Sequence, residues 1–548
     1  MKKILLLILL SLLSCPGVVS AQTVARKYLV LLSDKSASPY SLGRPEQFLS
    51  PRAIQRRQKQ GIPILERDLP VNPAYLSAIR QTGAVVWFSS RWLNAVLIQA
   101  DDATYARVRA LPFVKGVEMD RALANARQSA VQQNSQRLVN KLTTEQLAED
   151  IPASYGNSRN QLLQIGVDKM HQQGFRGEGM LVGILDAGFS NADRVPYLQH
   201  LFRDNRIIGT YDFVRKETSV YEDNSHGLNV LSIMGAYAEG QLVGPAYKAS
   251  FLLLRTEDAG SETPVEEANW LFGAEFADSA GVDVINSSLG YTEFDDSAFD
   301  HTYNDLDGKT TLVTRAARWA AESGMLVVVS AGNEGNGRWR YISAPADAPN
   351  VLSVGAVNGQ GQKASFSSVG PTTDGRIKPD VVAQGLGTVL GTPGGVIATG
   401  NGTSFSAPLV AALATGFWQA NPRLTAQQVI ESLRRSGDRV GSPDNEYGYG
   451  VPDFGRAQAF AQDSLSLLVY PNPFTDSDRL TVQWNEVPAN QSMEATLTNV
   501  AGQIIWRQRF PTDRVASMSL QPLNLAAGMY FLVLTTDTAR RTVKILKQ

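Results

Sequence analysis

Residues 400–408 read GNGTSFSAP and lead into an apolar, alanine-rich run at 407–414 with helical propensity. The small residues before Ser404 let the backbone turn tightly, which predicts the hydroxyl at the start of a buried helix. The unpaired N–H groups and the positive dipole at such a helix start stabilise negative charge that develops beside a nucleophile. Ser404 is therefore a candidate nucleophile, and the plainer alternative is a helix cap.

Apolar runs elsewhere in the chain predict buried parallel strands, and the stretches between them predict helices. The expected strands are 181–185, 251–254, 282–285, 326–329, 351–357 and 381–383, and the expected helices are 228–237, 265–279, 311–323 and 426–435. This alternation predicts an α/β fold with a doubly wound, mostly parallel sheet. Its ligand site is expected at the carboxyl ends of the strands.

Three further polar residues are expected at that edge of the sheet. Asp186 follows the first apolar strand, His226 begins a predicted helix, and Asn333 lies in the turn after 327–329. An acid, a base and a nucleophile are the parts of an activated serine, and an amide can donate a hydrogen bond to an oxyanion. Taken alone, each residue also has a structural interpretation as a loop carboxylate, a hydrogen-bonded core histidine or a turn residue.

Taken together, these residues resemble the subtilisin-like serine proteases, whose acid, base and nucleophile occur in the order Asp, His, Ser. The matching motifs are LDAG at 185–188, HG at 226–227, GTSFSAP at 402–408 and SAGN at 330–333. The resemblance extends from about residue 166 to 461. It implies an endopeptidase with Asp186, His226 and Ser404 as the triad and Asn333 in the oxyanion hole.

The same resemblance implies which residues bind the substrate. The chain also departs from the family at three positions near the triad. Ala187 stands where Thr or Ser is frequent, Leu228 where Thr is usual, and Asn229 where a second His is common. No cofactor is expected for the chemistry, and structural calcium is only implied by the family, with no ligand loop placed. The implied substrate-binding residues are Ser288, Leu289, Gly290, Ser330, Ala331 and Gly332.

Residues 1–21 have the layout of a secretory signal peptide, with two lysines, an apolar run and a small-residue cleavage site. The only cysteine, Cys15, lies inside this segment, so cleavage after Ala21 leaves no disulfide to stabilise the mature protein. The alternative is a lipoprotein acylated at Cys15, although Leu13 is bulky for such a site.

Residues 22–122 predict a β-α-β-β-α-β order, which is the ferredoxin-like α+β arrangement. A basic helix with Ser50 as its cap, Pro51 at its first position and Gly61 after its end is expected as an insertion. The polar stretch 123–155 predicts an exposed linker where proteases cut. The unit resembles the propeptides of the family, which implies a zymogen; an ordinary accessory domain is the alternative.

After the peptidase unit at 156–462, short alternating segments with turn signals predict a small antiparallel β-sandwich at 466–548. With YPNPF at 470–474 and GMYFL at 528–532, it resembles the sorting domain of the bacterial type IX secretion system. That implies export across the outer membrane, followed by release or surface attachment. A substrate-binding or P-domain-like sandwich is the alternative.

The formal net charge of −1 gives no indication of nucleic acid or an anionic membrane as a partner. The sequence therefore predicts a secreted, monomeric serine endopeptidase acting on proteins or peptides, with no membrane span after signal removal. One rival is an α/β-hydrolase lipase or esterase, but Ser404 lacks the second glycine of a nucleophile elbow and comes last in the chain order. The other rival is an inactive binding protein on the same scaffold.

Overall fold

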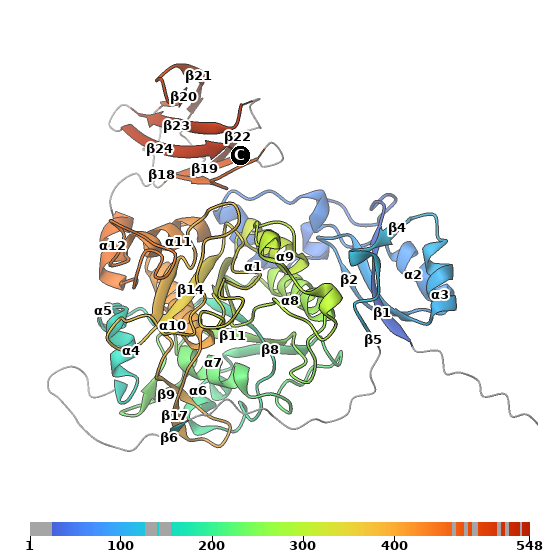
Figure 1. Ribbon diagram of the computed structural model, residues 1–548, viewed down its shortest axis with the longest axis horizontal. Helices are drawn as coiled ribbons and strands as arrows, with labels where there is room; N and C mark the ends of the chain where they lie inside the picture. Colours follow the sequence, from blue (N-terminus) through green and yellow to red (C-terminus); the bar gives the residue numbers. More distant parts are fainter. Residues whose placement is uncertain are drawn as a thin grey trace, which may run out of the picture.

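The structure is a computed structural model that describes residues 25–125, 140–141, 155–462, 467–475, 480–484, 492–511, 517–520, 525–536 and 540–547. We refer to residues 25–125 as the N-terminal unit, 155–462 as the central unit and 467–547 as the C-terminal unit (Figure 1). The predicted signal peptide and most of the predicted linker lie outside the described residues.

The central unit contains a seven-stranded sheet in which every pair of neighbours is parallel. The strand order is β15-β14-β13-β12-β7-β11-β8. The sheet confirms the predicted α/β fold. Its strands are β7 (Leu181–Asp186), β8 (Ile207–Asp212), β11 (Ser250–Arg255), β12 (Val284–Ser287), β13 (Leu326–Ser330), β14 (Leu352–Val357) and β15 (Val381–Gln384).

Helices cover both faces of this sheet. Side chains of neighbouring strand residues point to opposite faces and belong to two separate hydrophobic cores. In β7, Val182 and Ile184 pack with residues of α7, α10 and α11, whereas Leu181 and Leu185 pack with residues of α8 and α9. The helices are α4 (Arg159–Gln164), α5 (Val167–Gln172), α6 (Gln199–Arg203), α7 (His226–Gly235), α8 (Val265–Ala280), α9 (Leu312–Glu322), α10 (Thr403–Ala420), α11 (Ala426–Arg435) and α12 (Phe454–Gln462).

Some elements differ from the sequence-based expectation. Strand β12 begins at Val284, two residues later than predicted, because Val282 closes the turn after α8 by donating its N–H to the carbonyl of Ala277. The edge strand β8 was not predicted. Nor were the short strands β9 (Tyr237–Ala238), β10 (Leu242–Val243), β16 (Thr388–Gly391) and β17 (Ile397–Gly400); β17 also pairs with β6 (Asn140–Lys141).

The N-terminal unit has the predicted β-α-β-β-α-β order, and its antiparallel strands are arranged as β2-β3-β1-β4 with β5 beside β1. Asp101 caps the second helix of this pattern, because its side chain accepts the N–H of Thr104 at 2.7 Å. The elements are β1 (Arg26–Leu32), α2 (Pro73–Gln81), β2 (Val85–Ser90), β3 (Ala95–Ala100), α3 (Asp102–Arg109), β4 (Val114–Val117) and β5 (Ala124–Asn125).

An insertion of residues 33–71 between β1 and α2, called the insertion arm below, contains helix α1 (Pro51–Lys59). As predicted, Ser50 caps the helix by accepting the N–H of Ala53 at 3.2 Å. Elsewhere in the arm, the buried Lys35 Nζ donates to the carbonyls of Glu66, Arg67, Leu69 and Arg91 at 2.7–2.9 Å. Lys35 thereby ties the arm to the turn between β2 and β3.

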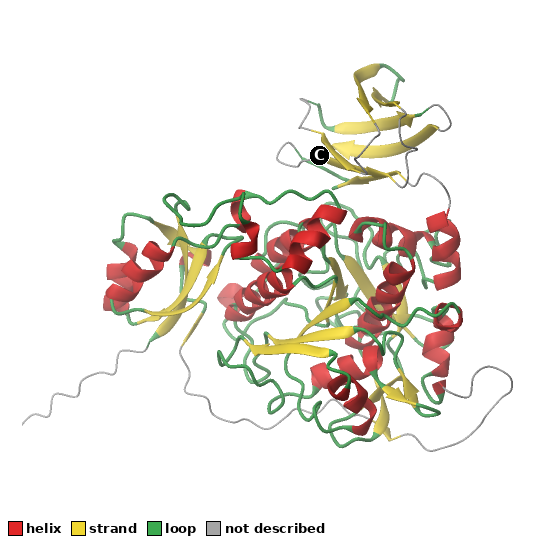
Figure 2. Cartoon of the chain, turned by 180° about the vertical axis from the view of Figure 1, so that it is seen from behind, coloured by secondary structure: helices red, strands yellow, loops and turns green. Residues whose placement is uncertain are grey.

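In the part of the C-terminal unit that the structure describes, the regular elements are all strands (Figure 2). One antiparallel sheet has the order β18-β19-β22 and the other β21-β20-β23-β24, and both contribute to one apolar core, which agrees with the predicted antiparallel sandwich. The strands are β18 (Leu467–Tyr470), β19 (Leu480–Trp484), β20 (Ser492–Asn499), β21 (Ile504–Pro511), β22 (Ser517–Leu520), β23 (Gly528–Thr535) and β24 (Arg540–Lys547).

None of the helices in the described residues has the length and apolar character that a membrane span requires.

Candidate active site

Asp186 is the last residue of β7, at the carboxyl edge of the sheet, and its side chain is fully buried. Its Oδ1 accepts two hydrogen bonds, from Nδ1 of His226 at 2.7 Å and from the N–H of Ala187 at 2.8 Å. Its Oδ2 has no hydrogen-bond partner among the described residues. A buried carboxylate held in this way can orient an imidazole and stabilise its protonated form.

His226 is the first residue of α7 and the side chain keeps 26% of its surface exposed. The start of α7 packs closely on the loop after Asp186: the N–H of Gly227 donates to the carbonyl of Gly188 at 2.9 Å. A Cβ on Gly227 would lie 2.6 Å from that oxygen, so only glycine fits here. Because Nδ1 faces Asp186, Nε2 is the nitrogen that remains to accept a proton.

Ser404 is the second residue of α10, and Gly402 is the cap position, so the simple helix-cap interpretation of Ser404 is wrong. Within residues 155–462 its Oγ donates to the carbonyl of Ser288 at 3.3 Å and makes no hydrogen bond to His226. The ring of the next residue, Phe405, stacks on the imidazole of His226 with 5.8 Å between centroids. The serine and the histidine therefore face the same space.

Asn333 follows β13, and its side chain is held by the residue before the serine. Its Oδ1 accepts from the backbone N–H of Thr403 at 2.9 Å and from the Thr403 hydroxyl at 3.0 Å. Because a backbone N–H can only donate, the atom that faces it must be the amide oxygen. The Nδ2 group of Asn333 is thus oriented away from Thr403 as a donor.

The predicted substrate-binding residues lie beside Ser404 on two segments that follow β12 and β13. Ser288 Oγ donates to the carbonyl of Ser404 at 2.9 Å, and Ser330 Oγ donates to the carbonyl of Leu289 at 3.3 Å. The N–H of Gly332 donates to Thr403 Oγ1 at 3.2 Å. The structure therefore brings the segments 288–290 and 330–332 together around the start of α10.

One departure from the family motif has a visible role. Asn229, in the first turn of α7, donates from Nδ2 to the carbonyl of Gly391 at 2.7 Å, and the N–H of Gly391 donates to Ser232 Oγ at 2.8 Å. These two bonds fix α7 to β16. Leu228 is fully buried in the hydrophobic core that α7 shares with α10.

A buried carboxyl group beside the site was missed by the sequence reasoning. Oε1 of Glu257 accepts from Tyr291 Oη at 2.5 Å and from Thr256 Oγ1 at 2.9 Å. Burial raises the pKa of Glu257 to about 8, and the nearby Asp186 carboxylate adds to this shift, whereas the two hydrogen bonds oppose it. Glu257 is therefore a neutral acid at pH 7.

Thr403 and Arg255 were also missed. Arg255 ends β11 and donates to Asp212 at 2.7 Å, to Asp223 at 2.9 Å and to the carbonyl of Ala187 at 3.2 Å, which links the loops that carry Asp186 and His226. The signal for Thr403 was its position next to Ser404. Arg255 had no comparable signal, since its partners are far away in the chain.

The described residues contain no group of three or more His, Cys, Asp or Glu side chains that could hold a metal ion.

Comparisons with known proteins were made for the whole chain. Residues 177–450 match the model of the subtilase family, peptidase S8. Residues 27–137 match a peptidase S8 propeptide domain of Bacteroidota, and residues 468–548 match a secretion system C-terminal sorting domain. The three matches follow one another along the chain as the three structural units do.

Individual relatives include subtilisin NAT of Bacillus subtilis subsp. natto, 29% identical over 376 residues that cover 68% of this chain and 82% of the relative. A subtilisin of Bacillus pumilus is 32% identical over 308 residues, covering 56% of this chain and 97% of the relative. The crystal structure of MycP1 from the ESX-1 type VII secretion system superposes with a TM-score of 0.45 at 23% identity, covering 60% of this chain and 90% of that one.

Proposed function

Because the chain belongs to the subtilase family, we propose that it is a serine endopeptidase that cuts peptide bonds through Ser404, His226 and Asp186. One observation carries the proposal: the 2.7 Å bond between Asp186 Oδ1 and His226 Nδ1 lies beside the helix start that bears Ser404. This geometry supports the roles of acid, base and nucleophile in the family order.

In the proposed mechanism His226 moves one proton. Nε2 accepts the proton of Ser404 Oγ as Oγ attacks the peptide carbonyl carbon, and Asp186 stabilises the imidazolium that forms. The 3.3 Å bond from Oγ to the Ser288 carbonyl is long for a hydroxyl donor, so little opposes the rotation of Ser404 toward His226. His226 then gives the proton to the leaving amine, and water cleaves the acyl-enzyme by the same route.

The negative charge of the tetrahedral intermediate falls on the former carbonyl oxygen. We assign its two donors to Nδ2 of Asn333, which the contacts of Thr403 orient, and to the backbone N–H of Ser404. The N–H of Ser404 lies in the first turn of α10, where the helix dipole favours negative charge. Segments 288–290 and 330–332 are proposed to bind the extended substrate.

The N-terminal unit is a subtilase propeptide, and the C-terminal unit is a type IX sorting domain, which indicates secretion or attachment at the outer surface. We propose that residues 1–21 are removed as a signal peptide and residues 22–122 after cutting in the linker 123–155, which leaves 156–462 as a monomeric peptidase before the sorting unit 466–548. We propose that the chemistry uses no cofactor; structural calcium is implied only by the family.

The activity is tested with purified, processed protein. A serine-directed fluorophosphonate should label Ser404, and the protein should digest casein, whereas Ser404→Ala should do neither. An unlabelled Ser404 together with intact casein would instead support an inactive binding protein on this scaffold.

The sorting function is tested separately in the native host. Deletion of residues 467–548 should leave the truncated protein in the periplasm, detected by cell fractionation and immunoblotting. Normal secretion of the truncated chain would contradict the proposal.

A further inference from the structure

Helix α1 of the insertion arm does not pack on the sheet of its own unit. It lies against α8 of the central unit, near α9, away from the strands β1–β4 (Figure 1). Two of its side chains, Arg56 and Arg57, are almost fully buried at 5% and 2% exposure. Burying a guanidinium costs free energy unless it is paired with an acceptor. The partners of these two arginines therefore show what the interface recognises.

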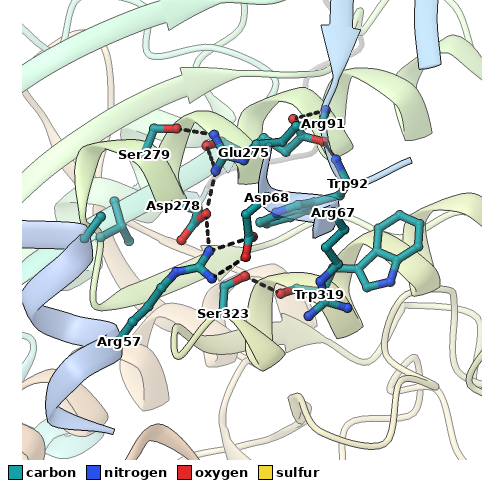
Figure 3. A network of polar contacts seen from close by, with 12 residues as sticks. Arg57, Arg67, Asp68, Arg91, Trp92, Glu275, Asp278, Ser279, Trp319 and Ser323 are labelled. Carbon is teal, nitrogen blue, oxygen red and sulfur yellow. Dashed lines mark hydrogen bonds and ion pairs between the residues drawn. The ribbon is translucent and has the colours of Figure 1, made fainter. Parts of the chain in front are cut away.

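Both arginines bind one carboxylate in the last turn of α8. Arg57 donates from Nη2 to Asp278 Oδ2 at 2.8 Å, and Arg56 donates to Asp278 Oδ1. Arg57 also forms a two-pronged pair with Asp68 of its own arm, at 2.9 and 3.0 Å (Figure 3). Asp68 fixes the guanidinium plane so that Arg57 presents its free edge to α8.

A third guanidinium reaches the same carboxylate from the turn between β2 and β3. Arg91 Nη2 donates to Asp278 Oδ2 at 2.5 Å, and the backbone N–H groups of Arg91 and Trp92 donate to Glu275 at 2.9 and 3.1 Å (Figure 3). Burial alone would raise the pKa of Asp278, but Arg57, Arg91 and Arg56 outweigh it and hold the pKa at about 2. Asp278 is therefore ionised and fully paired while the propeptide is in place.

The backbone around Asp278 adds further acceptors for the arm. Arg52 Nε donates to the carbonyl of Gly281 at 3.0 Å, and Arg56 Nη1 donates to that of Val282 at 2.6 Å. These carbonyls follow the C-terminus of α8, where the helix dipole is negative and cations are favoured. The surface is thus built to accept arginine side chains.

Gln60, just after α1, joins two more helices of the central unit. Its Nε2 donates to the carbonyl of Gly324 beyond the end of α9 at 2.7 Å, and its Oε1 accepts the N–H of Ala426, the first residue of α11, at 2.9 Å. A single amide therefore satisfies one unpaired group at the end of one helix and one at the start of another.

This surface lies at the opposite edge of the sheet from the active site. Arg52 contacts the carbonyl of Gly179 at 2.8 Å and the side chain of Asp283, which precede β7 and β12 respectively. The active-site residue Asp186 ends β7, and Ser288 follows the end of β12. None of the arm contacts involves a residue of the proposed catalytic site.

We propose that the ends of α8 and α9 and the start of α11 form a propeptide-binding surface away from the active site. This surface binds the arginine-bearing helix α1 and retains the propeptide after the linker has been cut. The partner is this chain's own insertion arm, and the chemistry of recognition is arginine on carboxylate and helix-end carbonyls. The inference depends on the proposed function only in assuming that the linker is cut during maturation.

The test separates retention from peptidase activity. In the Ser404→Ala chain, the recognition sequence of an added site-specific protease is placed within residues 126–139, the chain is cut there, and release of the propeptide is followed by native gel after dilution. The parent should stay associated. Arg56→Gln/Arg57→Gln should release the propeptide at least about 100-fold faster, because removing one side of a buried charge pair acts mainly on the dissociation rate.

The matched control is Arg44→Gln/Arg80→Gln, which changes two exposed arginines of the same unit and should leave the rate unchanged. Asp278→Asn should accelerate release from the other side of the interface. If the arginine variant fails to fold, the neutral change Gln60→Ala takes its place, with about 10-fold faster release expected. Release rates equal to the parent's in folded variants would overturn the proposal. An inactive wild-type chain would not, since an added protease makes the cut.

Discussion

At the carboxyl edge of the seven-stranded sheet, the Oγ atom of Ser404 makes one long hydrogen bond and Asp186 Oδ2 has no partner among the described residues. At the amino edge, three guanidiniums converge on Asp278, and the neighbouring carbonyls accept further bonds from the arm. The same sheet thus carries one carboxylate with an unpaired oxygen, Asp186, and one whose two oxygens both accept hydrogen bonds, Asp278.

The difference follows from what each site has to do. A nucleophile has to leave its resting hydrogen bond when it attacks, and the single 3.3 Å bond of Ser404 Oγ is weak enough to allow this. A binding surface gains most when each buried charge is paired in the complex, because an unpaired one costs several kcal/mol. Four predictions follow, in order of decreasing effect.

Asp186→Asn should have the largest effect, lowering kcat by about 10,000-fold, a magnitude known for triad aspartates in trypsin and subtilisin. An amide at this position can donate to Nδ1, so the imidazole adopts the wrong tautomer although the geometry is kept. The change is measured as casein or peptide hydrolysis, with Asp204→Asn as a surface control. A loss below 10-fold would remove Asp186 from the catalytic machinery.

Asn333→Ala should lower kcat by about 100- to 1000-fold with little change in KM, again by analogy with subtilisin, because its Nδ2 acts only on the developing oxyanion. Thr403→Val sharpens this test. It removes the 3.0 Å hydroxyl bond to Asn333 and the 3.2 Å bond from the N–H of Gly332, but keeps the 2.9 Å backbone bond that orients Asn333, so a loss of only about 5-fold is expected. Equal losses in both variants would mean that Asn333 has no direct role.

Gly281→Ala acts on the amino edge. Gly281 has φ 88°, and an added Cβ would lie 2.7 Å from Arg52 Cβ. Gly361 also has a positive φ, 76°, but an added Cβ has open space around it. Both substitutions should cost about 1–2 kcal/mol of backbone strain, but only Gly281→Ala should speed propeptide release from the cut chain. Similar release rates would show that the close fit at Gly281 does not matter for retention.

Glu257→Gln should have the smallest effect, seen as a change in pH dependence. Because burial raises the pKa of Glu257 from its ordinary value near 4.5 to about 8, its contribution to stability is complete below pH 4.5 and is lost as the pH rises to about 8. The slope is at most about 1.4 kcal/mol per pH unit. Guanidinium unfolding of the Ser404→Ala chain at pH 5, 6.5 and 8 should show a flatter profile for Glu257→Gln than for the exposed control Glu446→Gln.

The central sheet and the proposed triad could be predicted because each residue of the triad lies at one end of a long apolar run. Asp186 ends such a run, and His226 and Ser404 each begin one, so pattern and chemistry coincide at the same positions. Strand β8 escaped prediction because it lies at the sheet edge and its residues are mostly half-exposed, which leaves no apolar run to detect. The β16–β17 hairpin has strands of only four residues each.

The amino-edge surface could not be predicted for a different reason. Helix α1 was correctly located from its cap, its proline and its terminal glycine, but a basic helix has the same pattern whether its arginines face solvent or a carboxylate. Asp278, which settles the question, is 221 residues from Arg57 in the chain. Glu257 is similar, since its burial depends on Tyr291, 34 residues away.

The ammonium group of Lys35 sits in a cage of four backbone carbonyls, the arrangement by which an ionophore or a channel filter holds a metal cation. Here the cation is covalently part of the chain, so the turn that carries Arg91 is set by the polypeptide itself. Lys35 therefore holds this turn of the propeptide without a dissolved metal ion, and chelators should leave the turn intact.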